Sequence, residues 1–518
     1  MVLRLGIDVG GTNTDAVILD GRKVLAGVKC TTTEDVMSGI SEALEAVLEK
    51  AGVERANVDV AMIGTTHFTN AVIERRALDP VAAIRLGLPA TACLPPMVDW
   101  PEDLAEVVGD HRYMLHGGYE FDGREIAELD RDGLRRIADE IVAKGIRTAA
   151  ISSVFSPINR EMEEEARDIL QAAVPGLSVV LSSEIGRIGL LERESAAIMN
   201  ASLLSLADKT ITAFGDALKG AGLTCPFYVT QNDGTLMAAH MVRRFPVLTF
   251  ASGPTNSMRG AAFLTGVKDA IVIDIGGTTT DVGSLQKGFP RQASTVVDVG
   301  GVRTNFRMPD VFAIGLGGGT IISGEKDDLT IGPKSVGYRL GSEARVFGGG
   351  TLTCTDIAVA AGEAEIGDPS KVADMDPDFV AAVRARIGEM LEDAVERSRV
   401  SPEPLPVIAV GGGSILAPDR IGDLEVLRPE NFAVANAVGA AIAQISGEVE
   451  RIFSLASQSR EDCLAQADSE ARATAINAGA VAETLDVIER EDVPLAYLPG
   501  NATRIHVKVV GDMEGLDA

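Results

Sequence analysis

The sequence predicts an α/β protein of two or three domains, and three observations indicate this. Apolar strand-like segments alternate with amphipathic helical segments along much of the chain. The 518 residues are too many for one ordinary hydrophobic core. With 46% hydrophobic and 24% charged residues, the composition is that of an ordered globular protein.

The first predicted domain spans residues 1–190. Its expected strands are 3–9, 16–19, 61–63, 148–155 and 177–181, with helices at 34–51, 69–76, 125–144 and 161–173. A tight turn at 10–13 separates the first two strands, and Asp20-Gly21 is a hairpin-type turn. From 125 to 181 the strict alternation of helix and strand predicts mainly parallel pairing.

The second predicted domain spans residues 191–445, and a small α+β unit follows at 446–518. The second domain has a long helical stretch at 192–218 and strands at 227–231, 270–275 and 407–410. The chain becomes more charged from about Ser446. Helical stretches at 470–490 and a strand at 503–510 are expected there.

The charge of the chain argues against two classes of partner. The net charge is −28 and the pI about 4.6, so the surface repels nucleic acid and anionic membranes. Aromatic residues make up 4%, with Trp100 the single tryptophan, which leaves few platforms for stacking bases. We expect no nucleic acid and no membrane among the partners.

Targeting and redox features point to a cytoplasmic protein. The apolar start of the chain is far too short for a signal peptide, and the longest apolar stretch, 432–445, is too short to span a bilayer. The five cysteines are scattered and odd in number, so reduced thiols are expected instead of disulfides or a zinc site.

One short segment occurs twice. Residues 7–15 and 273–281 agree at seven of nine positions, and each follows an apolar strand. Both contain Asp-x-Gly-Gly-Thr, at Asp8 to Thr12 and at Asp274 to Thr278. A single copy is equally typical of a hairpin turn, but two copies suggest two similar halves. The segment is neither a Walker A loop nor a Gly-x-Gly-x-x-Gly fingerprint.

The composition of this loop suits a polyphosphate and its metal. Paired glycines let the backbone approach phosphate oxygens, and threonine hydroxyls add neutral donors. An aspartate at the strand end supplies a hard oxygen for Mg²⁺. ATP and Mg²⁺ are therefore expected, with Asp8 and Asp274 as catalytic and metal-binding residues. The expected phosphate contacts are Gly10, Gly11, Thr12, Asn13, Thr14, Gly276, Gly277, Thr278 and Thr279.

A third glycine turn completes the set. The apolar strand 407–410 ends in Gly411, Gly412 and Gly413. A turn without side chains lets an adenosine lie flat against the backbone. We expect these three glycines to contact the nucleoside.

These three elements, in this order, resemble the two phosphate loops and the adenosine loop of actin, heat-shock chaperone ATPases and sugar kinases. The intervening residues are similar to the hydantoinase/5-oxoprolinase family, of the hydantoinase A type. The matching segments are Gly64 to Ala71, Ser182 to Glu184, Glu192 to Ser195, Gln231 to Gly234, Ala251 to Pro254 and Ile314 to Gly319. The resemblance implies duplicated actin-like (ribonuclease H-like) ATPase domains around a nucleotide cleft.

The resemblance also implies an activity. Members of this type use ATP to open a cyclic amide, such as a hydantoin, 5-oxoproline or a lactam, by phosphorylating the amide oxygen. They act with a B-type subunit, so a separate partner and a hetero-oligomer are expected for a chain that stops at residue 518. Related proteins are ATP-dependent ketone carboxylases. A small-molecule kinase and a chaperone-like ATPase of the same fold remain alternatives.

Two segments depart from the family pattern. Thr255-Asn256-Ser257 replaces Ala-Gly-Gly after Ser252-Gly253-Pro254, and residues 340–348 replace a Pro-Gly-Pro-Ala-Cys-Tyr-Gly segment. Both changes put the identity of the substrate in doubt.

Several polar residues of the motifs have two interpretations each. His67 is either a satisfied interior histidine or a functional group. Thr65, Thr66 and Asn70 either contact a ligand or cap a helix. Two further segments, 231–233 and 317–319, are either ligand contacts or tight turns.

Overall fold

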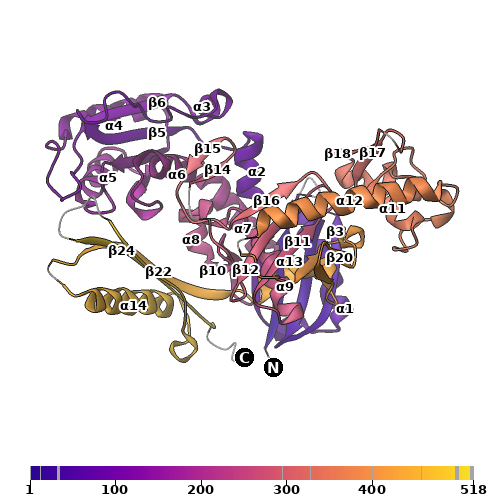
Figure 1. Ribbon diagram of the computed structural model, residues 1–518. Coiled ribbons are helices and arrows are strands. Elements are labelled where there is room, and N and C mark those ends of the chain that lie inside the picture. Colours follow the sequence, from indigo (N-terminus) through magenta and orange to yellow (C-terminus); the bar gives the residue numbers. More distant parts are fainter. Residues whose placement is uncertain are drawn as a thin grey trace.

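A computed structural model describes residues 2–11, 13–31, 36–293, 296–326, 328–399, 401–456, 458–495 and 501–513. It confirms the α/β class: three sheets of four or more strands are covered by helices (Figure 1). No helix in the described ranges is long and apolar enough to cross a membrane.

The largest sheet combines strands from both ends of the chain. Its order is β23 (Asp486–Pro494), β24 (Ala502–Gly511), β22 (Gln444–Ser454), β10 (Thr235–Ala238), β9 (Phe227–Thr230), β4 (Val58–Thr65), β1 (Leu3–Val9), β2 (Asn13–Asp20) and β3 (Lys23–Thr31). Strands from all three predicted domain ranges therefore hydrogen bond in one sheet. The boundaries at 190 and 445 remain a proposal.

A second sheet repeats the core of the first. Its strands are β13 (Phe289–Pro290), β12 (Thr280–Gln286), β11 (Ala270–Ile275), β19 (Val407–Val410), β21 (Leu424–Leu427) and β20 (Arg420–Ile421), with β16 (Val311–Ile314) beside β12. The order β13-β12-β11-β19 matches β3-β2-β1-β4, with the same antiparallel and parallel pairings. The duplicated sequence segment thus lies in a duplicated topology.

The third sheet is a separate parallel unit. Its order is β6 (His111–His116), β5 (Val81–Leu88), β7 (Thr148–Ser153) and β8 (Ser178–Leu181), all pairs parallel as predicted. In Figure 1 this unit lies above β22, β24 and a helix of the C-terminal region, α14 (Arg460–Asn477). Two small hairpins, β14 (Val297–Val299) with β15 (Val302–Thr304) and β17 (Thr320–Ser323) with β18 (Thr330–Ser335), complete the strands.

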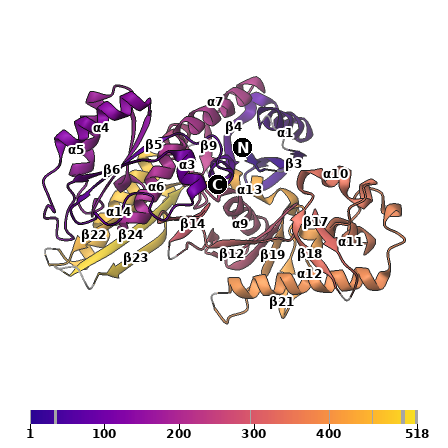
Figure 2. The same ribbon diagram turned by 90° about the horizontal axis from the view of Figure 1, so that it is seen from above.

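The remaining helices cover the sheets. They are α1 (Val36–Ala51), α2 (His67–Glu74), α3 (Glu102–Val108), α4 (Arg131–Lys144), α5 (Glu161–Ala173), α6 (Leu190–Ser202), α7 (Leu204–Gly220), α8 (Ala239–Arg244), α9 (Ser252–Thr265), α10 (Leu340–Glu343), α11 (Cys354–Ala360), α12 (Pro377–Ser398) and α13 (Ala435–Ala441). Figure 2 shows α12 running along the outer side of the second half.

Three predicted helices differ from those in the structure. The stretch 192–218 is divided at Leu203 into α6 and α7. The helix expected from 125 starts at Arg131, because the Asp130 side chain caps it by accepting from the amide of Gly133 at 2.7 Å. The helix expected over 470–490 is wrong in its second part, since α14 ends at Asn477.

The physical reason for the last difference is a tertiary pairing. Gly479 adopts a φ of 105°, which stops the helical path, and β23 then pairs along β24. The segment therefore gains a hydrogen-bonded neighbour strand that its helical composition did not reveal.

Helices α9 and α13 and strand β1 pack with their backbones in direct contact. Helices α9 and α13 cross so closely that a Cβ on Gly260 would lie 1.9 Å from the carbonyl oxygen of Ala435. One on Gly439 would lie 1.8 Å from the carbonyl oxygen of Asn256. Helix α13 also packs on β1, where Gly6 faces Ala437. Glycine is required here because two backbones touch.

Candidate nucleotide site

The two copies of the duplicated segment form matching hairpins. In the first, the amide of Gly10 donates to the carbonyl of Asn13 at 3.0 Å; in the second, Gly276 donates to Thr279 at 2.9 Å. The strands bring a second aspartate opposite the first in each hairpin: Asp8 pairs with Asp15, and Asp274 with Asp281. Each hairpin therefore carries two carboxylates.

Asp8 is held by an amide from each central helix. Asn256 of α9 donates from Nδ2 to Asp8 Oδ1 at 3.1 Å, and Asn436 of α13 donates to Asp8 Oδ2 at 3.0 Å. The carboxylate fits because its neighbour on β4 is Gly64, where a Cβ would lie 2.2 Å from Asp8 Oδ1. The Asp8 side chain is thereby fixed at the point where the halves meet.

Asp274 occupies the corresponding place in the second half. A Cβ on Gly411 would lie 2.2 Å from Asp274 Oδ1, the same distance as from a Cβ on Gly64 to Asp8 Oδ1. Gly411 therefore leaves room for the Asp274 carboxylate as Gly64 does for that of Asp8. Burial raises the pKa of Asp274, and a hydrogen bond from Ser257 opposes the rise. Consecutive residues of α9, Asn256 and Ser257, thus contact the aspartates of opposite hairpins.

Lys29 on β3 supplies a positive charge between the halves. Its Nζ lies 2.6 Å from Asp15 Oδ2, and its Cε lies 4.0 Å from where a Cβ on Gly412 would be. Asn436 also donates to Asp15 Oδ2, at 2.7 Å. The first half therefore reaches the third glycine turn, which belongs to the second half.

Burial controls the charge of these carboxylates. It raises the pKa of Asp8 to about 6, with Asp15 and Asp274 adding to the rise and the two asparagine amides opposing it. Burial, followed by the nearby Asp274, raises the pKa of Asp281 to about 7. Burial also raises the pKa of Asp15, against the attraction of Lys29. The group is short of positive charge.

A divalent cation fits this donor set. Carboxylate oxygens are the ligands that Mg²⁺ prefers, and the oxygens here are held by buried amide donors. Asp15 Oδ1 is buried and has no hydrogen-bond partner, so one oxygen lacks the compensation that buried acceptors normally have. A cation near Asp8 and Asp274 would supply it.

The structure places the predicted phosphate contacts unequally. Asn13 and Thr278 are half-buried and Gly11 and Thr279 exposed, so these residues are accessible to a ligand. Thr14 is fully buried in β2. Thr12 lies outside the described residues.

The third glycine turn packs directly on the second hairpin. The amide of Gly413 donates to the carbonyl of Ile275 at 2.7 Å, and that of Gly411 to Phe432 at 2.9 Å. These two amides are therefore committed to backbone partners. Gly412, beside Lys29, is the exposed member of the three.

Residues 317–319 form a tight bend. The amide of Gly317 donates to Thr320 Oγ1, that of Gly318 to the carbonyl of Gly276, and that of Gly319 to Gly277. Because all three amides have protein acceptors, the segment supports the second hairpin and leaves no N–H group for a phosphate.

The segment after β4 borders the first hairpin. Ser252 Oγ donates to the carbonyl of Thr65 at 3.1 Å, and the Asn70 amide lies 3.7 Å from where a Cβ on Gly11 would be. The Thr66 side chain does not cap α2. His67 bonds through Nδ1 to Thr65 Oγ1 at 2.6 Å instead of to backbone, and burial lowers its pKa.

Residues 231–233 are engaged mainly in the fold. Asn232 donates from Nδ2 to the carbonyl of Arg307, and Asp233 Oδ1 accepts from the amide and hydroxyl of Thr235. Asp233 also pairs with the buried Lys508 of β24 at 2.5 Å. The turn interpretation explains these contacts.

Sequence reasoning missed Asp15, Asp281, Lys29, Asn256 and Asn436. The two aspartates were visible in the repeated segment, and antiparallel pairing across a short turn would have placed them opposite Asp8 and Asp274. Asn256 was visible as a departure from a glycine pattern. No sequence signal indicated Lys29, because its proximity depends on how the halves meet.

Comparisons with known proteins identify the family of the chain. Residues 4–174 match the hydantoinase/oxoprolinase N-terminal region, and residues 193–368 match the hydantoinase/oxoprolinase family. The caprolactamase subunit alpha of Pseudomonas jessenii is 27% identical over 489 residues, 87% of this chain and 67% of that protein. The acetophenone carboxylase gamma subunit of Aromatoleum aromaticum is 26% identical over 398 residues, covering 69% and 53%.

A solved structure matches the fold over almost the whole chain. The ATP-dependent caprolactamase from Pseudomonas jessenii has a TM-score of 0.80 at 20% identity, covering 99% of this chain and 88% of that one. The curated relatives are longer: the aligned part spans about half to two thirds of their length.

Proposed function

The chain belongs to the hydantoinase/oxoprolinase family of ATP-dependent enzymes, and from that premise we propose that it binds ATP with Mg²⁺ between its two hairpins and uses it to open a cyclic amide. The proposed substrates are a hydantoin, 5-oxoproline or a lactam. The observation that carries the nucleotide part is the convergence of Asp8 and Asp274 on α9, through Asn256 and Ser257.

Each hairpin has a role in this proposal. Gly10, Gly11 and Asn13 would approach the phosphates from one hairpin, and Gly276, Gly277, Thr278 and Thr279 from the other; Thr12 stays a predicted contact. Asp8 and Asp274 would hold Mg²⁺ and its waters. When bound, the cation offsets phosphate charge. The protein's own contribution is position, which is most of what phosphoryl transfer requires.

The chemistry follows from the weakness of an amide as an electrophile. The amide oxygen takes the γ-phosphoryl group, the bond from that phosphorus to the ADP oxygen breaks, and ADP leaves. Water then attacks the carbon of the resulting imidate phosphate. The ring C–N bond of this tetrahedral intermediate then breaks, the leaving nitrogen takes a proton and becomes the amine, and an acyl phosphate remains. A second water displaces phosphate from the acyl phosphate and gives the carboxylate, so that the whole reaction consumes two waters, and their remaining protons pass to solvent. We assign the hydrolytic step to a B-type partner subunit, in a hetero-oligomer, because the relatives are named as subunits.

A second candidate is ATP-dependent carboxylation of a ketone. The similarity to an acetophenone carboxylase subunit supports it. A ketone enolate oxygen is also a phosphoryl acceptor, so the same hairpins serve both reactions. The two departures from the family pattern, at 255–257 and 340–348, leave the choice of acceptor open.

Phosphate release from Mg-ATP distinguishes the candidates. The purified chain is assayed with and without the B-type protein encoded beside it, and with 5-oxoproline, a hydantoin, a lactam, or a ketone plus bicarbonate. Stimulation by a cyclic amide, with ring-opened product in the presence of the partner, supports the first proposal. Stimulation by ketone and bicarbonate alone favours carboxylation, and a stable phosphorylated product favours a kinase. No stimulation despite ATP binding rejects both acceptors.

The nucleotide assignment has its own test in Asp8→Asn and Asp274→Asn. We expect each to lower kcat/KM for ATP by about 100-fold, because a lost metal contact costs on the order of 3 kcal/mol. Asp208→Asn is the matched control, since the Asp208 side chain is 70% exposed on α7 and pairs with Arg243. Normal ATP turnover by both hairpin variants would remove the assignment.

A further inference from the structure

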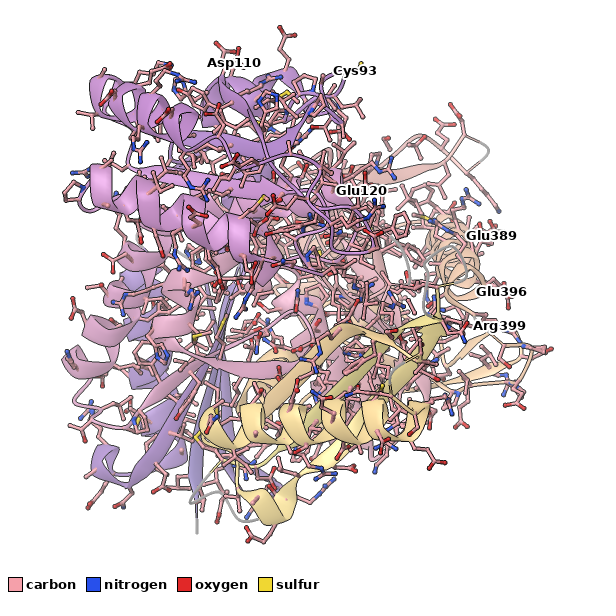
Figure 3. The ribbon with its side chains drawn as sticks, turned by 90° about the vertical axis from the view of Figure 1, so that its left-hand side faces the viewer. Cys93, Asp110, Glu120, Glu389, Glu396 and Arg399 are labelled. Carbon is pink, nitrogen blue, oxygen red and sulfur yellow. The ribbon has the colours of Figure 1, made fainter. Side chains whose placement is uncertain are left out.

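A second cavity lies between the four-stranded unit and the C-terminal strands, away from the hairpins. It has a volume of about 550 Å³ and is lined by residues that follow β8, by the turn between β9 and β10, and by β22. Figure 3 shows the region of β22 and α14 directly beneath the four-stranded unit. The volume is that of a small-molecule site.

Two arginines that line this cavity, Arg187 and Arg504, each have an N–H group without a hydrogen-bond acceptor. Arg187 Nε lies 3.4 Å from Glu450 Oε2, and Arg504 Nη1 lies 3.6 Å from Glu450 Oε1. Neither Nε has a hydrogen-bond partner although both are buried. Glu450 is already hydrogen bonded to Arg307 Nη2 at 3.1 Å. One carboxylate is thus shared by three guanidinium groups, which leaves N–H groups of Arg187 and Arg504 available.

Arg187 is held in place by a rigid frame. The fully buried Arg193 donates from Nη1 to the carbonyls of Arg187 and Ile188, at 2.8 and 2.7 Å. Asn305 accepts from the amide of Arg187 at 3.2 Å and donates to the carbonyl of Gly189 at 3.1 Å. A buried arginine therefore positions a second arginine at the cavity.

The rest of the lining limits the ligand. Ile185, Ile188, Phe245, Leu248 and Phe306 form an apolar wall. Burial lowers the pKa of Arg187, and repulsion from Arg307 and Arg504 adds to this, whereas attraction to Glu450 and Glu448 opposes it; the pKa stays lowered on balance, so an added negative charge would stabilise the charged form. Several carboxylates nearby disfavour a dianion. A planar monoanion with an apolar body fits both features.

The same cluster is unsuited to a metal ion. Ligand atoms of Glu448, Glu450 and His506 lie within 4.8 Å of one another. However, Arg307 pairs with both carboxylates, at 2.8 Å to Glu448 and 3.1 Å to Glu450. Its guanidinium provides the positive charge that a cation would bring.

We propose that this cavity binds a small organic carboxylate with an apolar body, its two oxygens facing Arg187 and Arg504 and its chain on the apolar wall. The site is separate from the nucleotide hairpins, since the segment 245–252 lies between the cavity and Thr65. It stands whether or not the chain opens cyclic amides. The turn after Thr230 links the two places, because Asn256 donates both to Asp8 and to Thr230 Oγ1.

Calorimetry with butanoate, hexanoate and hexanamide tests the proposal on the full chain. We expect hexanoate to bind more tightly than butanoate, because each buried CH₂ contributes about 0.8 kcal/mol. Hexanamide, which has the same shape without the charge, should bind about 10-fold more weakly or worse. Equal binding of acid and amide, or no binding of either acid, would overturn the proposal.

Variants locate the binding. Arg187→Gln should weaken hexanoate about 10-fold, and Arg504→Gln should do so independently if Arg187→Gln fails to fold. Arg243→Gln is the control, because Arg243 pairs with Asp208 outside the cavity. Hexanoate affinity that is unchanged in both cavity variants, or lowered equally in the control, contradicts the site.

Discussion

Lys29 carries a positive charge into a group of buried carboxylates and forms an ion pair with Asp15. A third of its side chain remains exposed, at 33%, on the side of Gly412. This position allows the ammonium to face a polyphosphate held between the hairpins.

We expect Lys29→Met to weaken Mg-ATP binding about 10-fold, since a charge-assisted contact contributes about 1.5 kcal/mol. Lys29→Arg should recover part of the loss. Lys23→Met, at the exposed start of the same strand, is the control. Titration calorimetry measures all three, and an unaltered affinity in Lys29→Met would place Lys29 in a purely structural role.

For single residues, the sequence predicted those that lie in the repeated segment. It missed those that reach the carboxylates from distant parts of the chain. Asp8 and Asp274 were predicted as site residues because they occupy equivalent places in two copies of one segment, and this assignment stays a prediction. Asn436 was missed because its contact with Asp8 spans 428 positions along the chain. Nothing local distinguishes such a residue from an ordinary polar side chain in a short helix.

Among the elements, the crossing of α9 and α13 tolerates the least change, because glycine is required where the two helices touch. Their backbones touch at Gly260 and Gly439, and Asn256, which binds Asp8, lies on one of the touching turns. A change in the spacing of these helices would therefore move a ligand of Asp8. The crossing therefore couples helix packing to the geometry of the proposed nucleotide site.

Gly439→Ala should destabilise the protein by about 1–3 kcal/mol, because the added methyl group meets a backbone oxygen and must push the helices apart. The matched control is Gly388→Ala in α12, where the Cβ position has no neighbour within 4 Å. That change should be neutral or stabilise by about 0.5–1 kcal/mol through higher helix propensity. Urea unfolding compares the two, and equal shifts would contradict the close crossing.

Elements were predicted well where the signal is local. The opening strand and the turn that follows it agree with the structure, and so does the parallel unit from 125 to 181, apart from one late helix start. The helix predicted over 486–490 is a strand, β23. This segment is extended because it hydrogen bonds to β24, and its own composition does not indicate that neighbour.

For the whole molecule, a ligand held by both hairpins should act as a clamp. Mg-ATP at about 100 times its dissociation constant should stabilise the folded state by about 2.7 kcal/mol. EDTA should abolish this gain, and so should Asp8→Asn or Asp274→Asn alone, because in the proposed site each half supplies one carboxylate to the metal. Thermal unfolding with and without Mg²⁺ measures it. A full gain in either variant would mean that one hairpin suffices.

The nine-stranded sheet has a consequence for how this chain is made. Strands β1, β2 and β3, at one end of this sheet, precede the other six in the chain, whereas β22, β24 and β23 at the opposite end join only after residue 444. Until then the free edge at β10 is an unpaired template for other chains. Contacts between such distant segments also form slowly. We therefore expect nascent chains stalled before β22 to require chaperone protection. Chains that include β22, β24 and β23 should no longer require it once they have folded.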